Sequence, residues 1–297
     1  MKNPVFTGSS VAIVTPFKDG KTDFKKLSEL VEFHLNNGTN SITICGTTGE
    51  ASTQTTEDHL DTIDRCVKMV NGRVPVVAGV GSNDTGHALE MALSAEQSGA
   101  DALLIVTPYY NKTSQHGLVQ HYTYIADRVK TPIIMYNVPG RTGMTFKTDT
   151  YVELSKHPLI NGVKEASGDF DAIATMMQAC GDDMNVWSGN DSQITPILAL
   201  GGKGVISVLA NIVPRETADI CKLFFENKPQ EAASLQVRLM ELINALFIEV
   251  NPVPVKTALN LMGMDVGPLR MPLFDMLPKN LEVLKKAMAN WGLSTAG

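Results

Sequence analysis

Lys164 is the residue of this sequence best placed to form a covalent bond with a substrate. It lies near the end of a short strand-like run and is followed at once by small residues and a turn. A lysine on a surface helix is usually only a solvated charge, whereas a lysine at the end of a buried strand loses water, which penalises the ammonium form. The uncharged amine can attack a carbonyl carbon and form a Schiff base.

The immediate neighbours of Lys164 suit such a role. Side chains alternate along a strand, so Lys164 is expected to share its face with Gly162 and Ala166. Two small neighbours would leave room for a ligand around the amine. Glu165 would then face the opposite way, and the sequence does not identify a partner for its carboxylate.

Further residues with suitable chemistry follow other strand-like runs. Tyr136 can donate a phenolic proton and accept it back when a carbinolamine loses water. Thr47 and Thr48, which lie between two glycines, offer hydroxyls and backbone N–H donors to a carboxylate. Arg141 offers a planar guanidinium to a second carboxylate. No carboxylate or histidine stands out as a general base, which favours a tyrosine–threonine relay.

Each of these residues also has a purely structural interpretation. A tyrosine such as Tyr136 is more often a core residue, a Gly-Thr-Thr-Gly run is more often a turn, and Arg141 could equally be a surface arginine in a loop. Tyr109 and Tyr110 could be interface aromatics, which are enriched at protein contacts. The catalytic hypothesis therefore depends on these residues meeting at one place in the fold.

Strand-like apolar runs recur along the chain, each followed by a helical segment. Most are continuous Val, Ile and Leu runs rather than alternating ones, which is typical of parallel strands covered on both faces. The predicted strands are residues 11–15, 41–45, 74–80, 102–107, 133–138, 161–166, 185–189 and 204–210.

The segments between these runs carry the 3.6-residue period of amphipathic helices. Most of them stop near a glycine or a proline, and several begin after a residue that can cap a helix. The predicted helices include residues 23–37, 84–98, 114–129, 170–179 and 214–226, and the predicted N-caps are Asp23, Thr56, Asp84 and Ser114.

This rhythm predicts an α/β fold, a closed (β/α)8 TIM barrel in residues 1–227, with its chemistry where strands end and the following loops begin. An open doubly wound sheet is the alternative, but it favours a Gly-rich phosphate loop after the first strand, and none is present. Residues 228–297 predict three helices, near 230–249, 253–261 and 279–290, packed on the barrel as a C-terminal helical extension.

Composition excludes several classes of function. The net charge is −6 without a basic block, so nucleic-acid binding is not expected. Residues 1–8 lack a signal-peptide core, and no run reaches the roughly 18 apolar residues of a membrane helix. The four cysteines form no C-x-x-C pair, which indicates reduced, partly buried thiols in a cytoplasmic protein.

Two other kinds of site are disfavoured. Metal ligands are expected at strand ends in a barrel, but all six histidines fall in helical or connecting segments, so no metal is predicted. Gly-rich stretches at 188–190 and 201–204 imitate a barrel phosphate site, and they remain a minor alternative.

Four motifs resemble those of the dihydrodipicolinate synthase family of pyruvate-dependent class I aldolases, and the likeness runs over essentially the whole chain. They are Gly46-Thr-Thr-Gly-Glu50, Tyr136-Asn-Val-Pro-Gly-Arg-Thr142, Val163-Lys-Glu-Ala-Ser167 and Gly204-Val-Ile-Ser-Val208. The resemblance implies a lyase of lysine biosynthesis that joins pyruvate to L-aspartate-4-semialdehyde, giving 4-hydroxy-tetrahydrodipicolinate. It implies no cofactor beyond the covalent Schiff base.

The resemblance also assigns roles to individual residues. Lys164 would carry the Schiff base, with Tyr136, Thr47 and Tyr110 as the proton relay. Tyr110 would reach the site across a subunit interface, in a homotetramer built from two tight dimers. The remaining binding positions are Thr48, Gly189 and Ile206 for pyruvate, and Arg141 for the carboxylate of the second substrate.

Two alternatives stay open at this point. N-acetylneuraminate lyase and keto-deoxy-sugar-acid aldolases share the lysine and the tyrosine, but Thr47 and Thr48 together with Arg141 favour the synthase, because a small dicarboxylate product calls for an arginine. A non-catalytic barrel that binds a keto acid is the second alternative.

Some relatives carry a lysine effector site, which this sequence matches only in part. His59, Asn83 and Tyr109 fit the pattern, and His87 replaces a carboxylate that would pair with the effector's ammonium. An imidazole accepts weakly and repels once protonated, so weak or absent inhibition by lysine is expected. The matching positions are Ala51, Ser52, Thr56, His59, Asn83, His87 and Tyr109, of which Ala51 and Thr56 also depart from the pattern.

Overall fold

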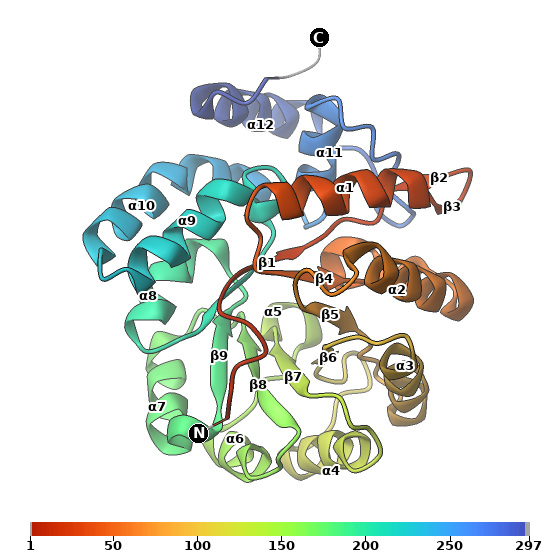
Figure 1. The fold of residues 1–297 in the computed structure, drawn as a ribbon, viewed down its shortest axis with the longest axis vertical. Helices are drawn as coiled ribbons and strands as arrows, with labels where there is room; N and C mark the ends of the chain where they lie inside the picture. The colour runs from red at the N-terminus through yellow and green to blue at the C-terminus, as the bar shows by residue number, and fades with distance from the viewer. Residues whose placement is uncertain (1, 295–297) are drawn as a thin grey trace.

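The computed structural model describes residues 2–294, in which parallel strands close into a barrel surrounded by helices (Figure 1). The strands are paired in the order β1-β10-β9-β8-β7-β6-β5-β4, and β1 pairs with β4 to close the ring. The predicted (β/α)8 TIM barrel is therefore confirmed. The barrel strands are β1 Gly8–Ala12, β4 Ser41–Ile44, β5 Val76–Gly79, β6 Ala102–Val106, β7 Ile133–Asn137, β8 Ile160–Glu165, β9 Asn185–Ser188 and β10 Gly204–Ser207.

The largest differences from the predicted strand boundaries occur in the first and the last strand. The first strand starts at Gly8 instead of residue 11, because buried Ser9 and Ser10 belong to the ladder although they are polar. The Ser10 hydroxyl lies 2.8 Å from that of Thr43, so burial leaves it hydrogen-bonded. The last strand ends at Ser207, where the chain turns into a short 3-10 helix, η5 Leu209–Asn211.

Helices cover the outside of the barrel, and most begin where the sequence predicted. Asp23, Asp84 and Ser114 each accept a backbone N–H three residues further on, which confirms them as N-caps. The prediction for Thr56 is wrong, since Thr55 caps that helix; adjacent threonines have the same capping preference, and the backbone path decides between them. The helices are α1 Phe24–Asn36, α2 Thr56–Val70, α3 Thr85–Gln97, α4 Gln115–Ala126, α5 Pro139–Thr142, α6 Thr148–Ser155, α7 Phe170–Cys180, α8 Ile194–Ala199 and α9 Pro214–Phe225.

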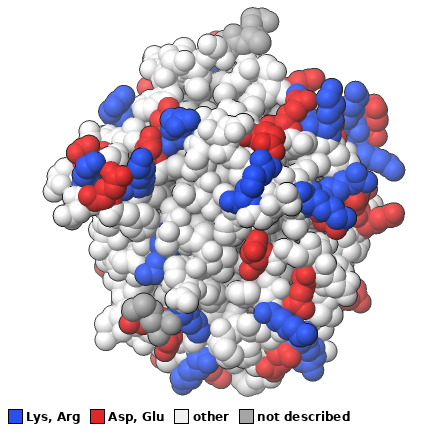
Figure 2. Space-filling model, in the orientation of Figure 1, with Lys and Arg blue, Asp and Glu red and all other residues white. Residues whose placement is uncertain are grey.

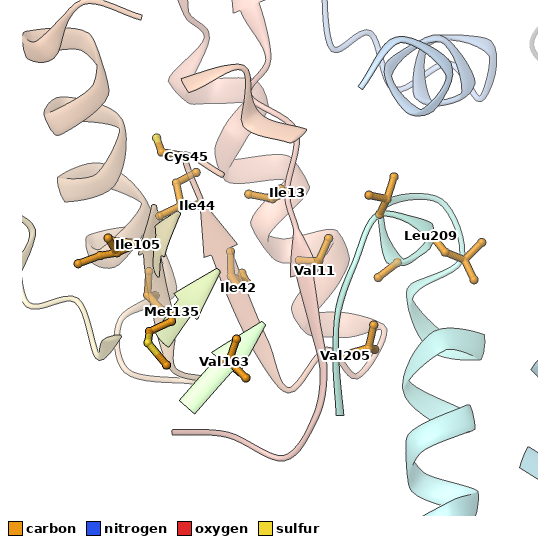
Figure 3. Packing of buried hydrophobic residues seen from close by; sticks show 14 of the residues in the cluster. Val11, Ile13, Ile42, Ile44, Cys45, Ile105, Met135, Val163, Val205 and Leu209 are labelled. Atoms are coloured by element: carbon orange, nitrogen blue, oxygen red, sulfur yellow. The ribbon is translucent and has the colours of Figure 1, made fainter. Parts of the chain in front are cut away.

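Apolar side chains form an inner and an outer layer of the barrel. The outer layer lies between strands and helices, and Figure 3 shows Ile105, Met135 and Val163 there on neighbouring strands. The inner layer includes Trp187 and Tyr136. Since Val163 belongs to the outer layer, alternation along β8 turns the next residue, Lys164, toward the interior.

The C-terminal segment forms helices α10 Pro229–Leu246, α11 Val253–Leu261 and α12 Pro278–Trp291. In Figure 1, α10 lies beside α9, and α12 lies at the edge of the molecule next to α11. Leu242, Leu259 and Leu284 from these helices belong to the same buried cluster as the outer barrel layer. The loop after β1 contains a short antiparallel pair of strands that the sequence did not predict. These strands are β2 Phe17–Lys18 and β3 Lys21–Thr22.

The surface and the cysteines can be described from the same residues. Acidic and basic side chains are interspersed on the face shown in Figure 2. Within residues 2–294, no helix combines the length and the apolarity needed to cross a membrane. Cys45, Cys66, Cys180 and Cys221 are free thiols, and all four are buried rather than partly buried as the sequence suggested.

Candidate active site

Lys164 lies inside the barrel, opposite Tyr136 on one neighbouring strand and Trp187 on the other. Its side chain is only 6% exposed. The Lys164 Nζ lies 4.4 Å from the centre of the Tyr136 ring. The amine and the phenol-bearing ring are therefore neighbours, at the carboxyl ends of β8 and β7.

The space around Lys164 differs in part from the expectation. A Cβ added to Gly162 would lie 2.8 Å from the Trp187 ring, so that ring, and not a ligand, occupies the space beside Gly162. A Cβ on Gly189 would lie 3.2 Å from Cε of Lys164, so the loop after β9 passes close to the amine. Trp187 was given no role from the sequence, although alternation along the predicted strand 185–189 places it on the same face as Gly189.

Asp191 is a buried carboxylate that the sequence analysis did not single out. It accepts hydrogen bonds from the Ser207 hydroxyl at 2.5 Å and from the Leu209 backbone N–H at 2.8 Å. Burial raises the pKa of Asp191, and these hydrogen bonds and the charge of Lys164 offset part of that rise. An acidic group that interacts with Lys164 is thus part of the site's electrostatics.

The two threonines lie in a short 3-10 helix, η1 Thr47–Gly49, directly after β4. Thr48 is buried, and its hydroxyl accepts a hydrogen bond from Nδ2 of Asn251 at 3.0 Å. The neighbouring Thr47 is exposed. The two hydroxyls therefore have different environments, which the sequence could not distinguish.

Arg141 lies in the short helix α5, where its Nη2 donates to the backbone oxygen of Asn251 at 2.9 Å. Asn251 thus contacts both residues: its backbone carbonyl accepts from Arg141, and its side-chain amide donates to Thr48. Asn251 belongs to the loop before α11, far from the barrel motifs in sequence, so the sequence analysis did not find it.

A cavity of about 380 Å³ is lined by part of the predicted catalytic, binding and effector residues. His59 lies in its wall, with Nε2 2.7 Å from the Gly79 carbonyl oxygen, and burial lowers the pKa of this imidazole. Lys164, Thr48, Gly189 and Ile206 lie outside the lining. The predicted residues that line the cavity are Thr47, Tyr136, Arg141, Ala51, Ser52, Thr56, His59, His87 and Tyr109.

Two further predicted residues, Tyr110 and Asn83, are not brought to this cavity either. Tyr110 is 92% exposed and has a left-handed backbone with φ of 67°, and Asn83 is also outside the lining. Neighbouring Tyr109 does reach the cavity wall while remaining 37% exposed. A single chain therefore does not place the Tyr110 hydroxyl beside Lys164.

Glu165, for which the sequence gave no partner, faces outward and is fully hydrogen-bonded. Its carboxylate accepts from Nδ2 of Asn137 at 2.9 Å, from the Tyr151 hydroxyl at 3.0 Å and from the Ser167 backbone N–H at 2.7 Å. Elsewhere, residues 2–294 contain no group of three His, Cys, Asp or Glu side chains arranged to hold a metal ion.

A buried amine beside a tyrosine at the carboxyl ends of barrel strands is the arrangement that Schiff-base chemistry on carbonyl compounds requires. Comparison with known proteins defines the family. A profile described as "Dihydrodipicolinate synthetase family" matches residues 5–290. The chain belongs to this family.

Individual relatives cover almost the whole chain. A 4-hydroxy-tetrahydrodipicolinate synthase of Thermoanaerobacter sp. (strain X514) is 53% identical over 291 residues, or 98% of each protein. The solved chloride-inhibited dihydrodipicolinate synthase of Acinetobacter baumannii complexed with pyruvate is 44% identical, with a TM-score of 0.94 over 97% of this chain and 99% of that one. A solved monomeric dihydrodipicolinate synthase variant is 40% identical, with a TM-score of 0.95 over 97% and 98%.

Proposed function

We propose that this chain condenses pyruvate with L-aspartate-4-semialdehyde to 4-hydroxy-tetrahydrodipicolinate, the first committed step toward diaminopimelate and lysine. The observation that carries the proposal is the buried Lys164 beside the ring of Tyr136. The 53% identity to a 4-hydroxy-tetrahydrodipicolinate synthase over nearly the whole chain supports the particular reaction.

The chemistry needs only side chains of this protein and its two substrates. The Lys164 amine attacks the keto carbon of pyruvate, and the carbinolamine loses water while Tyr136 and Thr47 pass the proton. Loss of a methyl proton gives an enamine, whose carbon attacks the aldehyde of the second substrate. The product's own amine then displaces Lys164 as the ring closes, which restores the free enzyme without a further cofactor.

Binding of the two carboxylates follows from the donors around the site. The Thr48 hydroxyl accepts from Asn251 and keeps its own proton to donate to pyruvate. Gly189 and Ile206, on the loop after β9 and on β10, complete the pyruvate pocket in this proposal. The guanidinium of Arg141 retains N–H donors beyond the one used on Asn251, and these bind the carboxylate of the aldehyde substrate.

We also propose an assembly and a location. The exposed Tyr110, with Tyr109 beside the cavity, supports a tight dimer in which each subunit supplies its tyrosine to the partner's site. Two such dimers would form a homotetramer. The four free thiols support a reducing compartment, the cytoplasm.

Two experiments test the proposal together: chemical trapping of the Schiff base and an assay of the condensation reaction. Borohydride in the presence of pyruvate should attach a reduced pyruvate to Lys164, which peptide mass spectrometry detects, and the purified protein should consume pyruvate with L-aspartate-4-semialdehyde. Turnover with N-acetylmannosamine but not with the semialdehyde would instead indicate a sugar-acid lyase. A protein that binds pyruvate without forming the adduct would be a keto-acid sensor.

A further inference from the structure

The carboxylate of Glu165 forms a network behind the catalytic strands. Oε1 accepts from Nδ2 of Asn137 at 3.1 Å and from the backbone N–H of Ser167 at 2.7 Å. Oε2 accepts from the same Nδ2 at 2.9 Å and from the hydroxyl of Tyr151 at 3.0 Å. The donors come from β7, from α6 and from the loop after β8, so one carboxylate joins three segments.

Asn137 and Glu165 each follow a residue of the proposed catalytic pair, Tyr136 on β7 and Lys164 on β8. Asn137 is the register partner of Glu165, as Tyr136 is of Lys164. The β7–β8 ladder ends at this position, where the backbone N–H of Ala166 donates to the Asn137 carbonyl at 2.9 Å. The side-chain network therefore ties β7 to β8 where the backbone ladder stops.

The backbone of Glu165 also holds the loop that approaches Lys164. Its carbonyl accepts from the N–H of Gly189 at 2.7 Å. Gly189 is the residue whose added Cβ would lie 3.2 Å from Cε of Lys164. Glu165 thus connects, through side chain and main chain, to segments on both sides of the amine.

Hydrogen bonds rather than tight packing fix this carboxylate. Glu165, Asn137, Tyr151 and Ser167 line a second cavity, of about 280 Å³, on the outer side of the strands. A cavity of this size beside the carboxylate gives the side chain room to move if its bonds are lost. The position of the end of β8 therefore depends on the hydrogen bonds that the Glu165 carboxylate accepts from Asn137, Tyr151 and Ser167.

We propose that Glu165 is a positioning residue that holds Lys164 opposite Tyr136 from outside the barrel, an inference that rests on the Schiff-base function above. Every partner of its carboxylate is a donor. A glutamine at this position loses the charge and keeps a single acceptor atom. Its N–H group would face a donor, so Tyr151 or Asn137 must reorient to accept it, which loosens the strand end. A displacement of about 1 Å at reacting groups costs on the order of 100-fold in rate.

The first experiment compares Glu165→Gln and Tyr151→Phe with the control Tyr122→Phe. Tyr122 is a buried tyrosine whose hydroxyl donates to the Ile105 carbonyl at 2.9 Å, so the control loses a similar bond in which Glu165 takes no part. Glu165→Gln should lower kcat and the rate of borohydride trapping at Lys164 by about 10- to 100-fold. The KM for pyruvate should stay within about twofold of the wild-type value, because the residues proposed to bind the carboxylate of pyruvate are unchanged.

Tyr151→Phe should lower the same rates by a smaller factor, and Tyr122→Phe should lower only the melting temperature. The exchanged pair Asn137→Asp with Glu165→Gln restores one carboxylate–amide contact across the strands and should recover part of the trapping rate lost in Glu165→Gln. This pair also provides the test if Glu165→Gln alone does not fold.

Wild-type trapping rates in Glu165→Gln, or equal loss of rate in Tyr122→Phe, would overturn the positioning role. Trapping uses pyruvate alone, so the role can be tested whatever the second substrate is. Wild-type protein that forms no pyruvate adduct would overturn the Schiff-base function instead, and the two failures are therefore distinguishable.

Discussion

The Nζ of Lys256 lies 2.6 Å from Oε1 of Glu50, and both side chains are excluded from solvent. Glu50 has a left-handed backbone directly after the 3-10 helix that carries Thr47 and Thr48, and Lys256 belongs to α11. The second carboxylate oxygen of Glu50, Oε2, accepts a hydrogen bond from the backbone N–H of Arg270 at 2.8 Å. The C-terminal helical segment therefore holds the threonine loop of the barrel through a buried ion pair.

Removing the cation of this pair should destabilise the protein strongly. Lys256→Met leaves the Glu50 carboxylate buried without its charge partner, which costs about 3–5 kcal/mol of unfolding free energy. The control is Lys26→Met, because the Lys26–Glu29 pair is partly exposed and contributes less than about 1 kcal/mol. Urea denaturation measures both variants, and similar small losses in the two would contradict the structural role of the buried pair.

Removing the amine itself should abolish covalent chemistry. Lys164→Ala deletes the nucleophile, so no pyruvate adduct should form and kcat should fall by at least about 10³-fold. The fold should persist, because only one inward side chain is shortened while the outer layer around Val163 is unchanged. Mass spectrometry after borohydride treatment and a condensation assay give the answer, and full activity in this variant would refute the proposed reaction.

Tyr110 should act in the partner's site rather than in its own. Inactive Lys164→Ala subunits and impaired Tyr110→Phe subunits, when refolded together, would form mixed dimers in which one site keeps both residues. About a quarter of wild-type specific activity should return in an equal mixture, since half the dimers are mixed and each has one intact site. If Tyr110 acted within its own subunit, mixing would restore nothing.

Inhibition by lysine should be weak because of His87. This imidazole lies in the wall of the 380 Å³ cavity, with Nδ1 3.8 Å from Oε2 of Glu90, where a carboxylate would suit an ammonium group better. We expect half-inhibition only above about millimolar lysine, weaker than about −4 kcal/mol of binding. His87→Glu should tighten inhibition about tenfold, or 1.4 kcal/mol. Sub-millimolar inhibition of the wild type would show the expectation wrong.

Acid should destabilise the protein partly through His34. This imidazole is fully buried, neither ring nitrogen has a hydrogen-bond partner within residues 2–294, and burial lowers its pKa from 6.5 to about 3. Between pH 6.5 and 3 the unfolded chain binds a proton that the folded protein does not, so stability present above pH 6.5 is lost as pH falls. The loss is about 1.4 kcal/mol per pH unit.

Chemical denaturation between pH 5 and 7 measures this loss. His34→Leu should reduce the dependence of unfolding free energy on pH by about one proton, which is about 2 kcal/mol between pH 6.5 and 5. The control His116→Leu removes an exposed imidazole and is measured over the same pH range. Equal slopes in wild type and His34→Leu would exclude a contribution from His34.

The barrel and much of its chemistry could be predicted because they depend on local patterns. Continuous apolar runs and amphipathic segments identify buried parallel strands and their covering helices, and the bounds of α11 were predicted to the residue. Thr55 and Thr56 have the same preference for capping a helix, so the predicted N-cap of α2 was off by one residue. The polar start of β1 was missed because Ser9 and Ser10 are buried by the ladder rather than by their own hydrophobicity.

The sequence alone determined the order of strands and helices, the inward direction of Lys164 and the family, because side-chain period and short motifs are properties of neighbouring residues. Only the tertiary structure decided that Trp187 fills the space beside Gly162, that Asn251 connects Thr48 with Arg141, and that Glu165 joins β7, β8 and α6. These contacts join residues distant along the chain, which come together only when neighbouring strands pair and the C-terminal segment packs on the barrel.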